Sequence, residues 1–161
     1  GMEIGDSLRG NMLVCAGIGV GSHFSAALVL SRLADAPLRD LLASGPAMDP
    51  GTLDRLVALA QAVHTRHRDL HEPVQLLAAF GGFEVAMMVG VMLVAASKRH
   101  MLMIDGMAAC AALMLASRIA SPITDYCVFC RSQTHHGLDR ALGLFQASAL
   151  LELGLDITTD S

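Results

Sequence analysis

Three short apolar runs divide the chain and predict buried β-strands. They cover residues 11–17 (NMLVCAG), 101–105 (MLMID) and 126–130 (YCVFC). Continuous apolar runs of this length, bounded by glycine or polar residues, are typical of strands buried on both faces. We therefore expect three strands of a parallel sheet.

The segments between these runs predict helices. The strongest prediction covers residues 84–97, because the basic run that follows, Lys98-Arg99-His100, suits a helix C-terminus. A helix at residues 22–33 has Ser22 as its expected N-cap. Residues 34–51 are rich in Pro, Gly and Asp and predict a loop. The other expected helices are 50–67, 74–80, 107–119 and 137–153.

Strands that alternate with helices predict an α/β fold. We expect a parallel sheet of about three strands, covered by helices on both faces in a Rossmann-like three-layer arrangement. Ligands in such folds bind beyond the carboxyl ends of the strands. These ends are residues 17–22, Asp105-Gly106 and residues 131–137.

The length and composition favour one domain, at residues 11–155. The chain has 161 residues, of which 53% are hydrophobic, and a mean hydropathy of +0.53. Gly1 before Met2 is typical of a tag remnant, so residues 1–10 are expected to be a scar and leader outside the fold. Residues 156–161 are expected to be a tail.

Charge and cysteine content narrow the function classes. The net charge is −4, no basic block occurs and only 4% of residues are aromatic, which disfavours nucleic-acid binding. Four irregularly spaced cysteines without a recognisable secretory leader favour reduced thiols in a cytoplasmic protein.

Residues 76–96 are long and apolar enough to raise the question of a membrane span. They contain Glu84 and the pair Gly81-Gly82, which would divide the span. A carboxylate at mid-membrane costs about 2.5–3.5 kcal/mol on insertion scales. A buried helix of a water-soluble protein is therefore favoured, with a membrane span and an oligomer-interface helix as alternatives.

A glycine-rich stretch, GIGVGS, connects the first strand to the first long helix. Glycines let the backbone approach a ligand, and the helix N-terminus presents N–H groups and partial positive charge, so the combination suits a phosphate. It lacks the lysine of a P-loop and the third glycine of a dinucleotide fingerprint. A tight strand-to-helix turn is the alternative. The candidate phosphate-binding residues are Gly17, Ile18, Gly19, Val20, Gly21 and Ser22.

Two carboxylates occupy positions where ligands bind in α/β folds. Glu84 begins a very apolar helix, where it either stabilises the helix dipole or orients a ligand. Asp105 ends the second strand, where it either contacts a ligand or caps the following helix.

Histidine and cysteine clusters raise the possibility of a metal site. His64, His67 and His71 are spaced along one helix face, but a solvated helix end explains them better. Cys127 and Cys130 precede His135 and His136, which resembles a zinc ligand set. Strand residues three apart point to opposite faces, so the two sulfurs should diverge. Buried packing thiols are favoured over a zinc or redox site.

The order of these motifs resembles one enzyme family. AAFGGFEVAMMVG is followed by MLMIDGMAACAALMLAS and then by SPITDYCVFCRS and ALGLFQASALLELG. This order is similar to nicotinate-nucleotide–dimethylbenzimidazole phosphoribosyltransferase, over residues 11–154 and most strongly over residues 80–154. The chain resembles only the later part of that family's roughly twofold longer polypeptide, without its end.

The resemblance implies a phosphoribosyl transfer from nicotinate mononucleotide to dimethylbenzimidazole in cobalamin synthesis. It implies an α/β homodimer that needs no metal or cofactor. It also implies that the glycine loop binds phosphate and that GGFE and Asp105-Gly106 border the substrate. The implied substrate-edge residues are Gly81, Gly82, Glu84, Asp105, Gly106, Arg131 and Ser132; Asp125-Tyr126 also match.

The chain departs from the family pattern in several places. The family continues its glycine loop with Asn-Thr, where Val20-Gly21 stand here, and a family Glu is replaced by Cys15. A Gly-Thr-Gly loop is poorly matched by residues 45–47. After Leu153-Gly154 the expected catalytic Glu is not found, and Asp156 and Asp160 are only weak candidates for it. We therefore expect an incomplete or degenerate relative with little or no activity.

Two hypotheses from other classes remain open. The chain is alternatively a non-catalytic module that assembles through residues 84–97, or a small zinc protein that uses Cys127, Cys130, His135 and His136.

Overall fold

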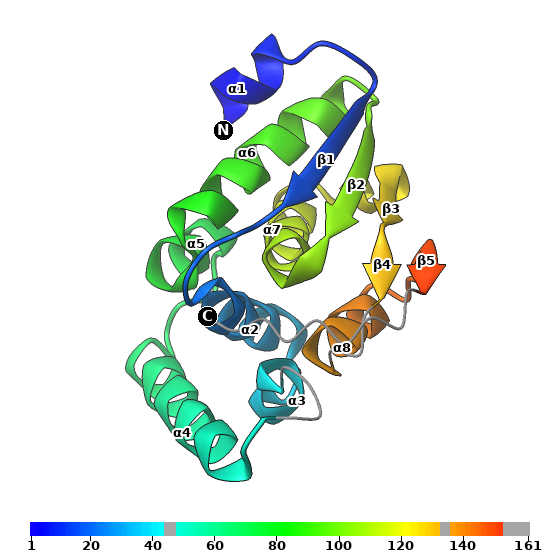
Figure 1. Ribbon diagram of the computed structural model, residues 1–161. Helices are drawn as coiled ribbons and strands as arrows, with labels where there is room; N and C mark the ends of the chain where they lie inside the picture. Colours follow the sequence, from blue (N-terminus) through cyan, green and yellow to red (C-terminus); the bar gives the residue numbers. More distant parts are fainter. Residues whose placement is uncertain (44–47, 133–135, 153–161) are drawn as a thin grey trace.

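The three predicted strands form one parallel sheet. The computed structural model describes residues 1–43, 48–132 and 136–152. The strands are β1 (Met12–Ala16), β2 (Met101–Asp105) and β3 (Cys127–Phe129), in the order β1-β2-β3. Helices flank this sheet, as Figure 1 shows, so the predicted α/β class is confirmed.

Five helices agree with the sequence pattern. Proline stands at the first helical position of α4 and of α5, where its missing N–H costs nothing. The carboxylate of Asp49 accepts a hydrogen bond from Thr52 N at 2.8 Å and so caps α4. The five are α2 (Ser22–Ala34), α4 (Pro50–Arg66), α5 (Pro73–Phe80), α6 (Phe83–Ser97) and α7 (Gly106–Ile119).

The structure corrects two expectations about local structure. The predicted loop 34–51 contains a helix, α3 (Leu38–Leu42), because Leu41 and Leu42 are fully buried. The last helix, α8 (His136–Leu144), ends well before residue 153. Phe145 there packs against Phe129 with ring centroids 5.3 Å apart.

The segment after α8 returns to the sheet instead of continuing the helix. Leu150 N donates to the carbonyl of Phe129 at 2.8 Å, and Leu151 N donates to the carbonyl of Cys130 at 3.0 Å. A short parallel pair follows, β4 (Arg131–Ser132) with β5 (Leu151–Glu152), while the 3₁₀ helix η1 (Ser121–Tyr126) precedes β3. These pairings join residues distant in sequence, so the local pattern does not reveal them.

The N-terminal residues are part of the packed structure. Residues 2–7 form a helix, α1 (Met2–Ser7), which lies against α6 (Figure 1). Two glycines let the helix backbones approach closely: a Cβ on Gly90 would lie 2.8 Å from Met2 N, and one on Gly5 would lie 3.2 Å from Val91 O. The expectation that residues 1–10 stay outside the fold does not hold for α1.

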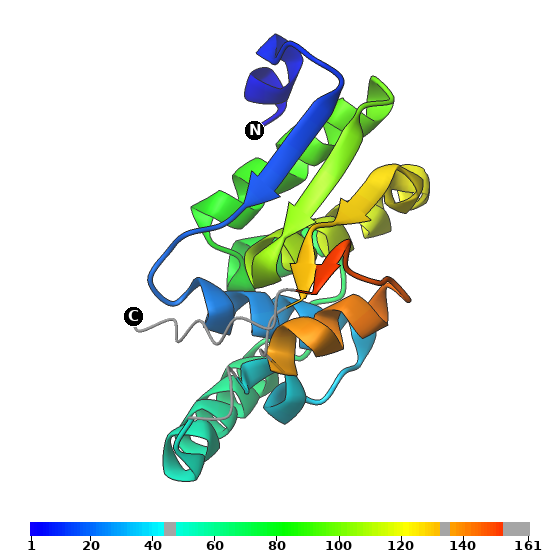
Figure 2. The ribbon, with the colours of Figure 1, turned by 45° about the vertical axis from the view of Figure 1, so that its right-hand side comes forward.

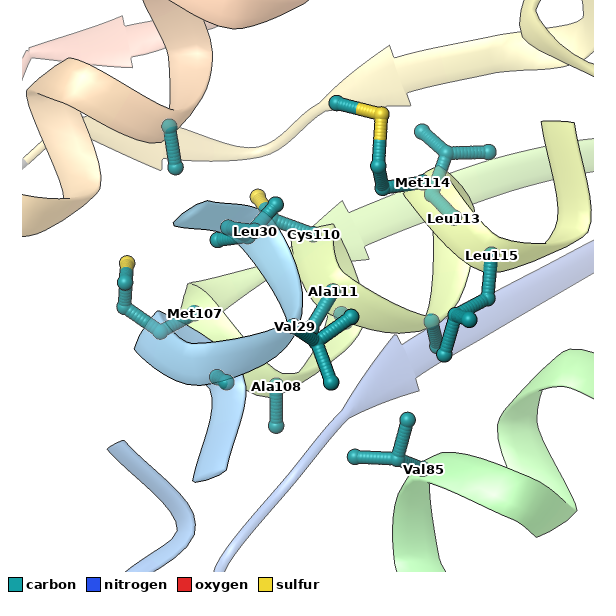
Figure 3. Close-up of a cluster of buried hydrophobic side chains, with 14 of the residues drawn as sticks. Val29, Leu30, Val85, Met107, Ala108, Cys110, Ala111, Leu113, Met114 and Leu115 are labelled. Carbon is teal, nitrogen blue, oxygen red and sulfur yellow. The ribbon is translucent and has the colours of Figure 1, made fainter. Parts of the chain in front are cut away.

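Helix α7 forms the centre of the molecule. All ten residues from position 107 to 116 are buried, and Figure 3 shows several of their side chains near Val29 and Leu30 of α2 and Val85 of α6. Alanine and cysteine supply much of this surface, which lets neighbouring helices pack closely. α7 therefore has apolar contacts all round, unlike a surface helix with one apolar stripe.

The two faces of the sheet are in different environments. The inner face is part of the hydrophobic core and packs against α6 and α7. Its residues are Leu13, Cys15, Leu102, Ile104, Cys127 and Phe129. The outer face consists of Met12, Val14, Met101, Met103 and Val128, with Ala16 and Asp105 at the carboxyl ends of β1 and β2. Figures 1 and 2 both show α6 and α7 on the same side of β1 and β2. The expected second helical cover is not supplied by the part of the chain that the structure describes.

The apolar segment 76–96 forms two helices. α5 ends at Phe80 and α6 begins at Phe83, so the predicted break at Gly81-Gly82 is confirmed. Within residues 1–43, 48–132 and 136–152, no helix is both long and apolar enough to cross a membrane.

Candidate functional site at the carboxyl edge of the sheet

The glycine loop and the second strand end lie side by side. Ala16 of β1 is in register with Asp105 of β2, so residues 17–21 leave the sheet beside the start of α7. This edge is where ligands bind in α/β folds. The predicted phosphate loop and the predicted Asp105-Gly106 substrate edge are thus brought together.

The loop opens α2 with no side-chain cap. Gly21 is the N-cap residue, in the left-handed conformation with φ +74°, and Ser22 is the first helical residue rather than the expected cap. Ser22 N donates to the carbonyl of Gly19 at 3.3 Å, which closes the turn. Among the described residues no side chain makes a capping hydrogen bond to the first turn of α2, a helix of 13 residues. Its N-terminal dipole therefore faces the open loop, the arrangement that favours an anion.

Gly17 is required by close packing rather than by unusual backbone angles. A Cβ there would lie 2.6 Å from the Cβ of Ala108 on α7. Any side chain at Gly17 would therefore push the loop away from α7 and from Asp105. Gly17 sets the height of the loop above the sheet edge.

Glu84 faces the loop from α6. Its Oε1 lies 3.7 Å from the position that a Cβ on Gly19 would occupy, and its carboxylate folds back over Gly82 at the helix start. Gly82 is the N-cap of α6, so the carboxylate lies in the first turn, where the helix dipole stabilises it. The two roles suggested for Glu84 are therefore compatible, because one side chain both stabilises the helix and faces the loop.

Asp105 both ends β2 and is the N-cap residue of α7. Its side chain makes no capping hydrogen bond to α7. Gly106 follows with φ +83°, a backbone conformation that glycine adopts without strain. The sharp turn at Gly106 places the start of α7 directly beyond the strand end.

Three apolar side chains around this edge are exposed. Ile18 is 100% exposed, Val20 94% and Phe83 91%. Apolar residues alternating with glycine in a loop beyond a strand end are a sequence signal for such exposure, since the loop has no core to pack against. The edge therefore combines N–H groups, a carboxylate and apolar surface.

The third strand end supplies fewer described features. Arg131 and Ser132 form β4 directly after β3, which places their backbone at the same edge. Asp156, Asp160 and the Gly45-Pro46-Ala47 segment lie outside the described residues.

Cys127 at the start of β3 is a packing thiol, as are Cys110 and Cys15. Cys127 donates to the carbonyl of Ile123, with 3.4 Å between sulfur and oxygen. Burial raises the pKa of Cys127 and of Cys110 to about 12, and that of Cys15 to about 11. All three thiols are therefore protonated at neutral pH. In the described chain no three His, Cys, Asp or Glu residues form a metal-binding group; His135 lies outside it.

Two of the helix-face histidines are packed rather than solvated. His64 and His67 contact the ring of Phe80, with centroids 5.4 and 5.6 Å apart. His64 Nε2 also hydrogen-bonds the carbonyl of Leu28 at 3.1 Å, and burial lowers the pKa of His64. The interpretation as a frayed, solvated helix end is wrong for His64 and His67, because α4 folds against α2 and α5. His71 is exposed.

A pocket of about 340 Å³ lies away from this edge, where α2 and α7 end and α5 begins. Two arginines line it. Arg32 donates to the carbonyls of His67 and Leu70, both at 3.3 Å, and Arg118 donates to that of Leu33 at 2.7 Å. These bonds satisfy carbonyls at helix ends, which gives both arginines a structural role.

Comparison with known proteins identifies the family. A family model described as a phosphoribosyltransferase matches residues 1–159. The chain belongs to this phosphoribosyltransferase family. A curated nicotinate-nucleotide–dimethylbenzimidazole phosphoribosyltransferase from Ralstonia nicotianae is 36% identical over 148 residues, 92% of this chain and 42% of that protein. The one from Janthinobacterium sp. is 34% identical over 158 residues, 96% of this chain and 46% of that protein.

A solved structure shows the same fold. CobT from Thermus thermophilus superposes with a TM-score of 0.82 at 21% sequence identity, over 96% of this chain and 46% of that chain. The chain thus spans less than half the length of the relatives it matches.

Proposed function

We propose that this chain forms the nucleotide-binding part of an enzyme that transfers the phosphoribosyl group of nicotinate mononucleotide to dimethylbenzimidazole. Curated relatives that match most of the chain carry the name of that activity. The observation that carries the proposal is the uncapped α2 N-terminus facing the glycine loop, beside Glu84 and Asp105.

The charges at the edge orient a phosphoribosyl ligand. The phosphate lies at the N-terminus of α2, where N–H groups and the helix dipole attract an anion. Glu84 repels a phosphate but accepts hydrogen bonds from hydroxyl groups, so the ribose hydroxyls face Glu84. The apolar side chains of Ile18, Val20 and Phe83 then border the aromatic base.

The chemistry requires a proton acceptor as well as a phosphate site. The bond between the anomeric carbon and the nicotinate nitrogen breaks, and a bond to an imidazole nitrogen of dimethylbenzimidazole forms. The unprotonated imidazole nitrogen forms this bond, the other ring nitrogen loses its proton to a base, and nicotinate leaves with the bonding electrons. A carboxylate in an apolar site suits the role of base. The sequence offers only Asp156 and Asp160 as weak candidates, so we propose that the 161-residue chain has little or no turnover by itself.

Calorimetric titration of the chain with nicotinate mononucleotide tests the binding step. A Gly19→Asp variant adds a negative charge beside Glu84 and the phosphate position, and we expect it to weaken binding about tenfold or more. Gly143→Asp adds the same charge on α8, where a Cβ meets nothing within 4 Å, and should leave affinity unchanged. Equal affinity for all three proteins, or no binding to any, would contradict the phosphate site.

Chromatography of nicotinate mononucleotide with dimethylbenzimidazole tests the predicted inactivity. Formation of α-ribazole phosphate and nicotinate at a catalytic rate would show that the chain holds its own base. We also propose the homodimer and cytoplasmic setting that the resemblance implies, which light scattering and cell fractionation test.

A further inference from the structure

The pocket at the ends of α2 and α7 concentrates positive charge. Arg32 of α2 and Arg118 of α7 line it together with His71. Among the described residues neither of these arginines forms a salt bridge, whereas Arg39 and Lys98 each pair with an aspartate elsewhere on the surface. A guanidinium group without a carboxylate partner keeps its full charge available to an anion.

Backbone carbonyls hold the two arginines in place and leave part of each side chain free. Nη2 of Arg32 donates to carbonyls of the turn that follows α4, and Nη2 of Arg118 donates to the carbonyl of Leu33, the residue after Arg32. The two arginines therefore meet at the end of α2. Within the described chain, Nε and Nη1 of both side chains donate no hydrogen bond. Their N–H groups remain available to a ligand, and the carbonyl bonds reduce the freedom that binding would remove.

The rest of the pocket suits a small molecule with a carbon skeleton. Its volume of about 340 Å³ lies in the range of small-molecule sites. Three leucines supply apolar walls, and one of them, Leu76, is only 1% exposed. The other two are Leu33 and Leu70. Pro73, which begins α5, also lines the pocket and so adds the positive end of a helix dipole.

The charges around the pocket favour an anion. The C-terminal ends of α2 and α7 also point here, and each carries about half a negative charge, so two full guanidinium charges outweigh them. The acidic residues nearest along the chain are exposed and do not line the pocket; they are Asp35, Asp69 and Glu72.

We propose that this pocket binds a small phosphate monoester. The phosphate lies between Arg32 and Arg118, and the carbon part of the ligand packs against the leucines. Phosphate is favoured because its terminal oxygens accept parallel hydrogen bonds from two guanidinium groups at once. His71 adds a further N–H donor at the exposed side of the pocket.

This site is separate from the phosphate position proposed at the glycine loop. α2 and α7 each begin at the carboxyl edge of the sheet and end at the pocket. At 1.5 Å per residue, Arg32 and Arg118 lie about 15–20 Å along these helices from the edge. The proposal does not rest on the proposed reaction, so it is tested without nicotinate mononucleotide.

NMR titration of the ¹⁵N-labelled chain with glycerol 3-phosphate provides the test. All proteins carry Gly19→Asp, which acts against phosphate binding at the glycine loop. The side-chain N–H signals of Arg32 and Arg118 should shift and saturate. Succinate and inorganic phosphate are titrated in parallel and should bind more weakly, because the first lacks the phosphate and the second lacks the carbon part.

Three substitutions locate the ligand. Arg118→Gln removes one charge but keeps an N–H donor, and should weaken binding about tenfold or more. His71→Glu adds a carboxylate at an exposed position, leaves the carbonyl bonds of both arginines intact and should weaken binding by a similar factor. Arg55→Gln is the matched control, because Arg55 is exposed on α4 away from the pocket, and should leave affinity unchanged. Circular dichroism verifies folding, and His71→Glu keeps the test decisive if Arg118→Gln does not fold.

Three results would overturn the proposal. They are the absence of a saturable shift at either arginine, equal affinity in His71→Glu and Arg55→Gln, and tighter binding of succinate or inorganic phosphate than of glycerol 3-phosphate. Failure of nicotinate mononucleotide to bind the original chain would contradict the proposed function and leave this second site standing.

Discussion

The two faces of the sheet come from the same three strands, yet only one is inside the molecule. On the inner face Leu102 and Ile104 are at most 2% exposed, whereas on the outer face Met12 and Val14 are more than half exposed. Apart from Asp105 at the end of β2 both faces are apolar, so the hydrophobic pattern does not separate them. The difference lies in what packs against each: α6 and α7 cover the inner face, and no described element covers the outer one.

This contrast shows that apolar character marks a surface to be buried without saying what buries it. When a strand has polar residues on one face, its sequence indicates which face contacts solvent, as in many antiparallel sheets. Over most of their length β1 and β2 do not, because their outer residues before Ala16 and Asp105 are methionine and valine. Their outward residues are apolar enough to be buried, but no described element of the chain packs over them.

The largest expected effect is the difference in unfolding free energy between a substitution on the inner face and one on the outer face. Leu102→Ala empties space in the inner layer and should cost about 2–5 kcal/mol of unfolding free energy. Val14→Ala removes exposed atoms and should change it by no more than about 0.5 kcal/mol. Urea unfolding followed by circular dichroism measures both. A Val14→Ala cost close to that of Leu102→Ala would show that the outer face is covered in solution.

Helix α1 covers part of the surface of α6, and a substitution at Gly90 tests this contact. Gly90→Ala would bring a Cβ within 3.1 Å of backbone atoms of Gly1 and Met2, so α1 must shift, at a cost of about 1–3 kcal/mol. Gly143→Ala is the control, since its Cβ has open space and helix propensity favours alanine by about 1 kcal/mol. Thermal unfolding should place the two variants on opposite sides of the original protein. Equal midpoints would mean that α1 does not pack on α6.

Packing of α4 against α2 and α5 should make the unfolding free energy moderately dependent on pH. Burial lowers the folded-state pKa of His64 below its ordinary 6.5, so the unfolded chain binds the proton more tightly. Stability is fully present above pH 6.5 and falls as the pH drops through 6.5 toward the folded-state pKa. Unfolding free energies between pH 8 and pH 5, a range of about three units around the ordinary histidine value, measure this slope.

A His64→Gln variant should flatten that pH dependence. The exposed His71 provides the control, and His71→Gln should keep the slope of the original protein. An unchanged slope in His64→Gln would show that the contact with Phe80 is not maintained.

The smallest effect is expected at the fully exposed end of α1. Lys98 Nζ lies 2.8 Å from Asp6 Oδ1 and lowers the pKa of Asp6 below 3.8. The ion pair therefore adds stability above pH 3.8 that is lost as the pH falls through the folded-state pKa. Because Asp6 is exposed, salt screens the pair. Asp6→Asn should slightly lower the thermal midpoint at neutral pH and low salt. The difference should disappear in high salt; its persistence would rule out an ionic origin.

Most of the elements were predictable because their signals are local. Proline and Asp49 at the start of α4, the glycine pair before α6 and the apolar run of β2 are each contained in a few residues. α3 and the segment after α8 were not predictable in this way. They depend on burial of Leu41 and Leu42, and on backbone bonds from Leu150 and Leu151 to β3.

The same distinction between local and long-range signals applies to the candidate site. Its motifs, GIGVGS, GGFE and the Asp105-Gly106 strand end, were visible in the sequence, as was the family that they resemble. The proximity of Glu84 to Gly19 was not, since the two residues lie far apart along the chain. Neither was the close contact that requires glycine at position 17.

The sequence by itself determined the α/β class, the three strands and the phosphoribosyltransferase family, because periodicity, turn residues and motifs are properties of short segments. Only the tertiary structure decided that α7 is the central helix, that Glu84 faces the glycine loop and that the outer face of β1 and β2 is uncovered within the described residues. Hydrophobic burial has no direction of its own. An apolar strand or helix can be buried by several partners, and the chain's three-dimensional course selects among them.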